Sequence, residues 1–491
     1  MDLKDYRQQI DTIDHQLVQL FLRRMQIAAN IADYKKHNGL PVLDAVREQQ
    51  KLDTVCDGVD REMQPYVRQL YQSLFALSRQ YQTKKNARCG LIGRTLGHSY
   101  SPAIHRLLGS YPYELFEIEP EMLEDFLLHG AWTGLNVTMP YKKAVIPHCD
   151  ELSPLAAQLQ SVNTLVRRTD GTIFGDNTDA WGFARMLQQL NCRCAGKKAL
   201  VLGSGGASVT VQAVLRSQGA QVVMISRSGA DNYANLDRHD DAAILVNATP
   251  VGMYPNSGEA PVDLELLPHL EAVLDLVYNP VRTRLILDAE RRQIPCLSGL
   301  TMLVAQAVRA SELFTDTAIS AETVAAVQDE IARQTENLVL IGMPGSGKTT
   351  VGKLLAAQTG KRFVDADEEL EKRIGSIPAF FAAHGESAFR KEETALLAQL
   401  GQQSGLVLAT GGGCVTRTEN RDLLRQNGTV ICLLRDLHKL PSDGRPMSQQ
   451  HGVEILYRQR KSLYEFFADF SVDNNGSPEQ TVQTILNRRI P

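Results

Sequence analysis

The chain has 491 residues, of which 43% are hydrophobic and 22% charged, and its formal net charge is −4 at neutral pH. This length exceeds what one hydrophobic core usually organises, and it predicts about three domains. The small net charge gives no field that would favour nucleic acid or an anionic membrane, and no run of eighteen apolar residues predicts a membrane span.

The cysteines and the first residues indicate a cytoplasmic protein. Eight cysteines are scattered along the chain, and the nearest two, Cys192 and Cys194, have no second pair with which to form a zinc site. Residues Met1 to Asp14 are charged rather than apolar, so we expect no export signal. We therefore expect reduced thiols.

Residues 1–85 are predicted to be an all-α domain of three helices. They contain almost no glycine, their apolar residues repeat with helical spacing, and Asn38-Gly39-Leu40-Pro41 ends the first helix. Arg24 and Lys35 are eleven residues apart, about three turns, so they leave the same face of that helix. Any one such residue, taken alone, is more often a solvated surface charge.

The polar residues of this segment, taken as a set, resemble the all-helical chorismate mutase family over residues 3–83. The resemblance implies that the two carboxylates of chorismate are held by Arg7, Arg24 and Arg47, with Ser78 beside one of them. It implies that Lys35 and Gln82 donate hydrogen bonds to the breaking ether oxygen. Asp44 and Glu48 would orient the hydroxyl and neighbouring groups. The rearrangement of chorismate needs no nucleophile and no proton transfer. It needs a compact conformer of the substrate and hydrogen-bond donors aimed at the developing negative charge, and cationic and amide side chains supply these.

The position of Arg7 predicts a homodimer. Arg7 lies seventeen residues before Arg24, about 4.7 turns, and projects roughly 100° away from the face that Arg24 shares with Lys35. Two short helices cannot cover the apolar stripe of so long a helix. We expect an intertwined dimer in which Arg7 completes the partner's site, as the resemblance also implies. The alternative is a regulatory or dimerisation module that binds an aromatic amino acid, against which the filled set of charged positions argues.

An α/β region begins near Cys89, where short apolar runs alternate with amphipathic stretches. The loop Gly203-Ser204-Gly205-Gly206-Ala207-Ser208 follows an apolar strand and precedes a helical run, which is the setting that a dinucleotide pyrophosphate needs. Ser208 replaces the third glycine of the motif, which alone is weak. The next strand ends in Ser226-Arg227-Ser228, and Arg227 in place of the usual acid favours the 2′-phosphate of NADP.

Several motifs in order around this loop resemble the shikimate dehydrogenase family. They are His98-Ser99-Tyr100-Ser101-Pro102, Asn136-Val137-Thr138-Met139-Pro140-Tyr141-Lys142, Ser161-Val162-Asn163-Thr164, Gly175-Asp176-Asn177-Thr178-Asp179, Asn247-Ala248-Thr249-Pro250, Tyr278 and Leu303-Val304-Ala305-Gln306. The family commonly has a second basic residue after the arginine, where this chain has Gly229 to Asn232, so we expect a weaker NADP preference than usual.

The resemblance implies that Lys142 and Asp179 form the acid/base pair at the carbonyl of 3-dehydroshikimate. A proton must reach oxygen as hydride reaches carbon, and a lysine bonded to a carboxylate can supply it. Ser99 and Ser101 would hold the substrate carboxylate, and the pocket would be completed by Thr138, Asn163, Tyr278 and Gln306. Quinate in place of shikimate is the alternative substrate at this site.

A last boundary falls at Gln328 to Asn337, before a strand and the loop Gly342-Met343-Pro344-Gly345-Ser346-Gly347-Lys348-Thr349. This is a complete phosphate-binding loop, and we expect Gly345 to Thr350 to bind ATP. Lys348 would lie on the phosphate charge and the Thr349 hydroxyl on Mg²⁺. The loop predicts a nucleotide and leaves the acceptor open.

The acceptor is indicated by Phe363-Val364-Asp365-Ala366-Asp367, Phe389-Arg390, Gly411-Gly412-Gly413, Arg445-Pro446 and Arg460-x-x-x-Tyr464, which resemble shikimate kinase from residue 336 to the end. Arg390 and Arg460 would clamp the shikimate carboxylate. Asp367 would bind the attacking hydroxyl, with Asp365 close to Mg²⁺. The glycine triplet and Arg445 would belong to the substrate site.

The predicted lid of this segment departs from the family. Only Arg435 to Gly444 lie between the strand ending at Leu434 and Arg445, and an arginine typical of the lid is missing. Arg435 or Lys439 could substitute for it.

The sequence thus predicts a multidomain enzyme of aromatic biosynthesis with three parts. They are an all-α chorismate mutase domain (1–85), an α/β dehydrogenase (88–325) and an α/β P-loop kinase (336–491). The dehydrogenase would divide into a substrate domain (88–190 with 298–325) and a Rossmann domain (195–297). Its partners would be chorismate, 3-dehydroshikimate, shikimate, NADP(H), ATP and Mg²⁺, with no nucleic acid or membrane.

Overall fold

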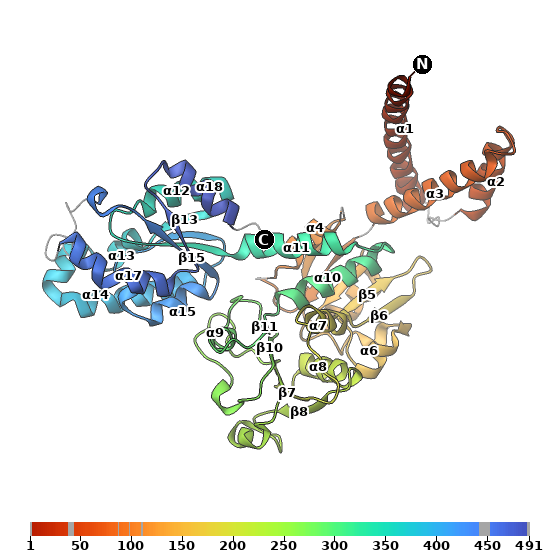
Figure 1. Cartoon of the computed structure of the whole chain (residues 1–491). Coiled ribbons are helices and arrows are strands. Elements are labelled where there is room, and N and C mark those ends of the chain that lie inside the picture. Colours follow the sequence, from red (N-terminus) through yellow and green to blue (C-terminus); the bar gives the residue numbers. More distant parts are fainter. Residues whose placement is uncertain are drawn as a thin grey trace. The chain divides into compact units, whose positions relative to one another are not determined.

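The computed structural model describes residues 2–37, 44–86, 88–97, 99–109, 111–440 and 452–488. The chain forms two compact units, Met1–Gly182 with Val304–Val327 and Phe183–Leu303 with Gln328–Pro491. Across the described ranges, no helix has the length and apolar character needed to cross a membrane. Figure 1 shows the elements of both units coloured along the chain.

The first unit begins with three helices, which confirms the all-α prediction. These are α1 (Leu3–His37), α2 (Ala45–Asp57) and α3 (Gln64–Asn86). The Asp44 side chain begins α2 by accepting a hydrogen bond of 2.9 Å from the Arg47 amide. The small residues Ala28, Ala29 and Ala32 of α1 are buried, because the second half of α1 packs against α3. The N-terminal half of α1 projects away from α3 (Figure 1).

A six-stranded mixed sheet follows, in the order β2-β1-β3-β5-β6-β4. Its strands are β1 (Cys89–Gly93), β2 (Tyr113–Glu117), β3 (Gly134–Val137), β4 (Glu151–Leu152), β5 (Thr164–Arg167) and β6 (Ile173–Asp176). Strand β5 runs antiparallel to both neighbours. The α-helices beside this sheet are α4 (Ser101–Leu108), α5 (Leu123–His129), α6 (Pro154–Leu159), α7 (Thr178–Gln189) and α10 (Leu300–Thr315). Two short 3-10 helices are η1 (Pro120–Met122) and η2 (Ile146–His148).

The second unit opens with a parallel sheet in the order β11-β10-β9-β7-β8. Its strands are β7 (Lys198–Leu202), β8 (Gln221–Ile225), β9 (Ile244–Asn247), β10 (Ala272–Asp275) and β11 (Cys296–Leu297). Between them lie α8 (Gly206–Ser217), η3 (Tyr233–His239), η4 (Leu264–Leu266) and α9 (Arg284–Arg291). Strand β7 is fully buried from Ala199 to Leu202, as expected for a central parallel strand.

The last sheet is also parallel, in the order β13-β14-β12-β15-β16. Its strands are β12 (Asn337–Ile341), β13 (Arg362–Asp365), β14 (Leu406–Ala409), β15 (Gly428–Leu434) and β16 (Phe470–Asp473). Its helices are α11 (Ala321–Thr335), α12 (Lys348–Thr359), α13 (Ala366–Ile374), α14 (Ile377–Gly401), η5 (Cys414–Thr416), α15 (Glu419–Arg425), η6 (Leu437–Lys439), α17 (Val453–Phe467) and α18 (Pro478–Arg488). The order reverses at β12, so ligands are expected at its carboxyl end.

Candidate active sites

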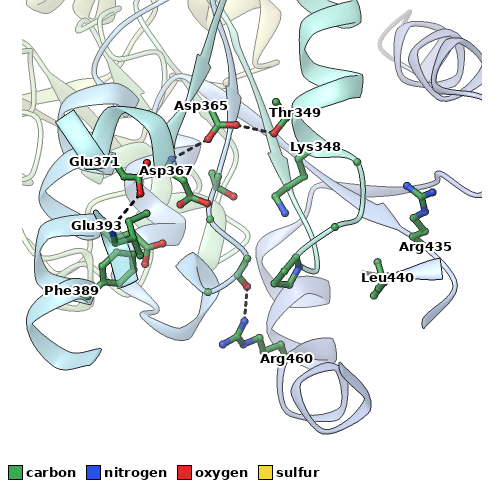
Figure 2. A pocket seen from close by; sticks show the side chains of 18 of the residues that line it. Lys348, Thr349, Asp365, Asp367, Glu371, Phe389, Glu393, Arg435, Leu440 and Arg460 are labelled. Carbon is green, nitrogen blue, oxygen red and sulfur yellow. Dashed lines mark hydrogen bonds between the residues drawn. The ribbon is translucent and has the colours of Figure 1, made fainter. Parts of the chain in front are cut away.

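A pocket of about 820 Å³ opens at the carboxyl end of β12 (Figure 2). The phosphate-binding loop forms one wall of the pocket, where Gly345 and Gly347 have φ angles of 84° and 96° that favour glycine. Lys348, the first residue of α12, donates hydrogen bonds from Nζ to the carbonyl oxygens of Gly342 (2.9 Å) and Met343 (3.1 Å). The loop is therefore shaped for phosphate, with its cation held against its own backbone.

Thr349 and Asp365 meet beside this loop. Thr349 Oγ1 donates to Asp365 Oδ2 at 2.8 Å, and Asp365 also caps α13 by accepting from the Asp367 amide at 3.1 Å. A hydroxyl and a carboxylate oxygen at this point are hard donors of the kind that Mg²⁺ takes. Within the described ranges, no cluster of three or more His, Cys, Asp or Glu side chains is arranged to hold a metal by itself.

The opposite wall carries a buried arginine among carboxylates. Arg390 Nη1 lies 2.8 Å from Glu393 Oε2, and Arg390 Nη2 lies 3.1 Å from Glu386 Oε1. Burial raises the pKa of Glu393, although Arg390 opposes that rise. A Cβ atom on Gly413 would lie 2.0 Å from Arg390 Nη2, so only glycine lets the guanidinium occupy this place. The arginine is thereby fixed at the pocket.

The rest of the glycine triplet brings the other predicted substrate residues together. A Cβ on Gly411 would come within 2.8 Å of Asp367 Oδ1 and of Glu393 Oε1. The carbonyl oxygen of Gly412 accepts from Arg460 Nη1 at 3.1 Å, as Figure 2 shows, and from the Tyr464 hydroxyl at 2.5 Å. Desolvation raises the pKa of Asp367, and the charge of Lys348 opposes the rise.

The two candidates for the missing lid arginine differ in their surroundings. Both Arg435 and Lys439 line the pocket. A Cβ on Gly347 would lie 3.6 Å from Arg435 Nη1, and Arg435 Nε is buried with no hydrogen-bond partner among the described residues. Lys439 instead pairs with Asp436 at 3.5 Å. The predicted substrate residue Arg445 lies outside the described residues.

In the first unit, Lys142 and Asp179 form an ion pair. Lys142 Nζ lies 2.5 Å from Asp179 Oδ2, and both side chains are largely buried, with 25% and 14% of their surface exposed. Asp179 is in the first turn of α7, whose Thr178 amide donates to Asn163 Oδ1 at 2.7 Å. The backbone carbonyl of Lys142 accepts from the Val162 amide at 2.8 Å. Neighbouring strand ends therefore hold both partners in place.

The other predicted substrate residues of the dehydrogenase lie on several different elements. Ser99 Oγ accepts from the Ser101 amide at 3.2 Å at the start of α4. Thr138 follows β3, and its amide donates to Ile92 O at 3.0 Å. Gln306 lies on α10 and is buried, whereas Tyr278 follows β10 in the second unit.

The glycine-rich loop after β7 is open in front of α8. Cβ atoms on Gly205 and Gly206 would meet nothing within 4 Å, which leaves room for a pyrophosphate at the helix N-terminus. The unexpected Ser208 is fully buried, and its Oγ donates to Gly203 O at 2.6 Å. A serine therefore fits here by bonding the loop it follows.

Beside this loop, the Arg227 side chain is exposed at the end of β8. The nearby Asp231 is engaged with His239 at 3.0 Å. An anion at the end of β8 can therefore approach the Arg227 guanidinium from solvent.

The helical segment brings some of its predicted site residues together and leaves others apart. Arg24 of α1 donates to Ser78 Oγ and, at 3.2 Å, to Leu74 O of α3. Gln82 is buried, and its Oε1 has no hydrogen-bond partner among the described residues. Lys35 is partly buried, while Arg7 and Arg47 are exposed. The assignment of Arg7 to the site of a partner chain stays a prediction.

Sequence reasoning missed the partners of two predicted residues. Glu48 forms an ion pair with Arg79 of α3 at 2.6 Å, and Arg390 pairs with Glu393. The i,i+3 spacing of Arg390 and Glu393 on one helix was a usable signal. Nothing in the sequence links Glu48 to Arg79, because they lie on different helices.

Three family models match the chain in order. Chorismate mutase type II matches residues 6–83, the shikimate dehydrogenase substrate binding domain matches 91–165, and shikimate kinase matches 344–489. These matches confirm the three resemblances drawn from the motifs.

Individual relatives agree with the middle match. The NADP(+) shikimate dehydrogenase of Methanopyrus kandleri is 39% identical over 259 residues, covering 46% of this chain and 89% of that protein. The Pelodictyon phaeoclathratiforme enzyme is 38% identical over 265 residues, covering 48% and 93%. A solved chorismate mutase/shikimate 5-dehydrogenase fusion protein from Clostridium acetobutylicum is 33% identical and covers 50% of this chain and 97% of that one, with a TM-score of 0.47. The chain belongs to the shikimate dehydrogenase family and joins to it a chorismate mutase type II segment and a shikimate kinase segment.

Proposed function

We propose that the intact chain interconverts 3-dehydroshikimate and shikimate with NADP, phosphorylates shikimate with ATP and Mg²⁺, and rearranges chorismate to prephenate in the cytoplasm. The observation that carries this proposal is the kinase pocket, where a phosphate-binding loop faces the buried cations Arg390 and Arg460. An acceptor with a carboxylate and a hydroxyl fits between them, and the dehydrogenase product has both. Three separate activity assays on the intact chain test the proposal.

In the dehydrogenase, the Lys142 ammonium would donate a proton to the carbonyl oxygen of the substrate. The Asp179 carboxylate would hold the lysine in place and relay a proton from solvent back to its amine. NADPH would supply the hydride when bound, Gly205 and Gly206 leave room for its pyrophosphate, and the exposed Arg227 would bind its 2′-phosphate. Ser99, Ser101, Thr138, Asn163, Tyr278 and Gln306 would bind the substrate. Comparing shikimate with quinate, each with NADP and with NAD, decides between the alternative substrates and cofactors.

In the kinase, Asp367 would bind the hydroxyl that attacks the γ-phosphate, and burial raises the pKa of this carboxyl above its usual value. Lys348 would stabilise charge on the phosphates, and Thr349 with Asp365 would hold Mg²⁺. Arg390 and Arg460 would fix the acceptor's carboxylate.

Arg390→Ala should raise the KM for shikimate by about tenfold to a hundredfold, the value of one or two charged hydrogen bonds, with the KM for ATP unchanged. Steady-state kinetics of the full chain measure both constants. Glu386→Ala is the matched control, because it removes an exposed partner of Arg390 and leaves the guanidinium in place. An unchanged KM for shikimate in Arg390→Ala would remove this residue from the acceptor site.

Arg435→Ala should lower kcat for shikimate phosphorylation by about tenfold, since a cation beside the phosphate-binding loop stabilises the transferring group. The KM for shikimate should stay near the parental value. Lys439→Ala is the control, because Lys439 is paired with Asp436. If Lys439→Ala loses the activity and Arg435→Ala keeps it, the roles are reversed.

The helical segment is proposed to act as an intertwined homodimer. Apolar side chains are exposed along α1 with alternating spacings of three and four residues, namely Leu3, Tyr6, Ile10, Ile13, Leu17 and Leu20. This heptad spacing is typical of the apolar seam of a coiled coil, and we infer that a second helix covers the seam. Arg24 and then Ile27, Ile31 and Tyr34 continue the same spacing, so the seam leads into the site.

A further inference from the structure

Within the second compact unit, a short turn of the shikimate kinase segment lies at the centre of its contact with the NADP-binding domain. This turn, Arg425–Gly428, joins α15 to β15. The Val281 amide donates to Asn427 Oδ1 at 2.9 Å, and the Arg282 amide donates to Gln426 O at 2.8 Å. Both donors are backbone groups of the segment that follows β10 and carries Tyr278. The contact therefore bonds to the main chain of a loop of the dehydrogenase.

Side chains reinforce the same contact. Arg282 Nη1 donates to Arg425 O at 3.2 Å and to Gly428 O at 3.3 Å. Asp422 of α15 forms an ion pair with Arg291 of α9 and lies 3.6 Å from Arg284 Nη1. Only 17% of the Asp422 side chain is exposed, so this pair is less screened than a surface pair.

A second patch lies beside the turn. Gln402 Nε2 donates to Ser257 Oγ at 3.2 Å, and Ser257 is only 2% exposed. Gln426 and Asn427 are each 4% exposed. Buried amides and hydroxyls are costly without partners, and several of their partners here lie across the contact. The contact is thus specific rather than a chance apposition of two surfaces.

The turn is a rigid support on the kinase side. Asn427 Nδ2 donates to Gly401 O and Gln402 O at 3.3 Å each, and Asn427 O accepts from the Asn337 amide at 2.7 Å. Asn337 is the first residue of β12, the central strand that leads into the phosphate-binding loop. Asn427 therefore connects the core of the kinase sheet to Val281.

On the dehydrogenase side, hydrogen bonds within the same domain hold the segment around Tyr278. Asn279 O accepts from the Tyr254 amide and Val277 O accepts from the Gly299 amide, at 3.0 Å each. Asp275 Oδ1 accepts from the Val277 amide at 3.0 Å, and Asp275 Oδ2 accepts from Thr283 Oγ1 at 2.6 Å. Asn427 accepts its hydrogen bond from Val281, which lies between Val277 and Thr283. Tyr278 lies three residues before Val281, within the same stretch.

We propose that the kinase segment docks on the NADP-binding domain through Asp422 and Asn427 and acts as a brace that positions Tyr278 for the dehydrogenase. The brace rests on the proposed place of Tyr278 in the substrate pocket; the docking does not. Asn427 and Asp422 are positioning residues of an active site that belongs to another domain of the same chain.

Hydrogen exchange and dehydrogenase kinetics of full-length variants test the proposal. In Asn427→Ala and Asp422→Arg, amide exchange of Val281 and Arg282 should accelerate about tenfold or more, since the hydrogen bonds of these two amides across the contact open more often. The KM for shikimate should rise several-fold with kcat within about twofold, because a loosened Tyr278 must be ordered on binding. Kinase activity should persist, which shows that the kinase segment stays folded.

Glu419→Arg is the matched control: it makes the same charge change on α15, where Glu419 pairs with Arg417 of its own segment. It should alter neither readout. Arg291→Glu added to Asp422→Arg should restore slow exchange and the parental KM in part. Unchanged exchange in both interface variants overturns the docking. Accelerated exchange with an unchanged KM for shikimate would show that the docking does not position Tyr278. An unchanged KM in Tyr278→Phe would show that Tyr278 does not contribute to substrate binding.

Discussion

Lys142→Ala should lower turnover of 3-dehydroshikimate by about a hundredfold or more, the usual cost of losing a positioned proton donor. The ammonium is 2.5 Å from Asp179 Oδ2 and largely shielded from solvent, so water cannot easily take its place. NADP binding, kinase activity and mutase activity should survive, because the glycine-rich loop and the other sites lie on separate elements. Stopped-flow and steady-state assays of the full chain measure the loss.

Lys143→Ala is the control for that experiment, since this neighbouring lysine is exposed. It should retain turnover within about twofold, as surface substitutions usually do. Asp179→Asn should also be strongly impaired, because it removes the carboxylate that holds the ammonium. If Lys142→Ala stayed within a few-fold of the parent, Lys142 would not be the acid.

The features that local patterns alone predicted are those whose residues are contiguous, whereas the Lys142–Asp179 pair followed from the family resemblance. The phosphate-binding loop Gly342–Thr349 lies between β12 and α12, and the glycine-rich loop after β7 opens α8, because each local pattern contains its own strand, turn and helix. Ser208 shows that a departure from a motif can keep its geometry when a side chain bonds back to the loop.

Features that depend on tertiary contacts were not predictable. Arg79 and Asp422 both look like ordinary helix-surface charges in the sequence, since neither lies in a motif. Their partners, Glu48 and Arg291, are brought to them only by packing between distant segments. The buried acid Glu393 was missed for a related reason, because its burial follows from the close approach of the glycine triplet.

The mutase proposal makes the sharpest prediction about assembly. The first helix has 35 residues and therefore extends about 52 Å, far beyond the portion that α3 covers. Arg7 lies on the uncovered part, among the exposed apolar residues of the seam. If a partner helix covers that seam, Arg7 is carried to the partner's Arg24 and Lys35. Arg7→Ala and Lys35→Ala chains should each be nearly inactive as mutases.

Mixing these two inactive variants under conditions of subunit exchange should restore activity. A heterodimer has one site that lacks both residues and one that is intact, so each heterodimer should recover up to about half of the parental activity. Two differently tagged Lys35→Ala chains, mixed in the same way, should recover nothing. Tag pull-down establishes that exchange occurred. If heterodimers form and no prephenate appears, Arg7 either serves its own chain or lies outside the site, because recovery requires that it cross between protomers.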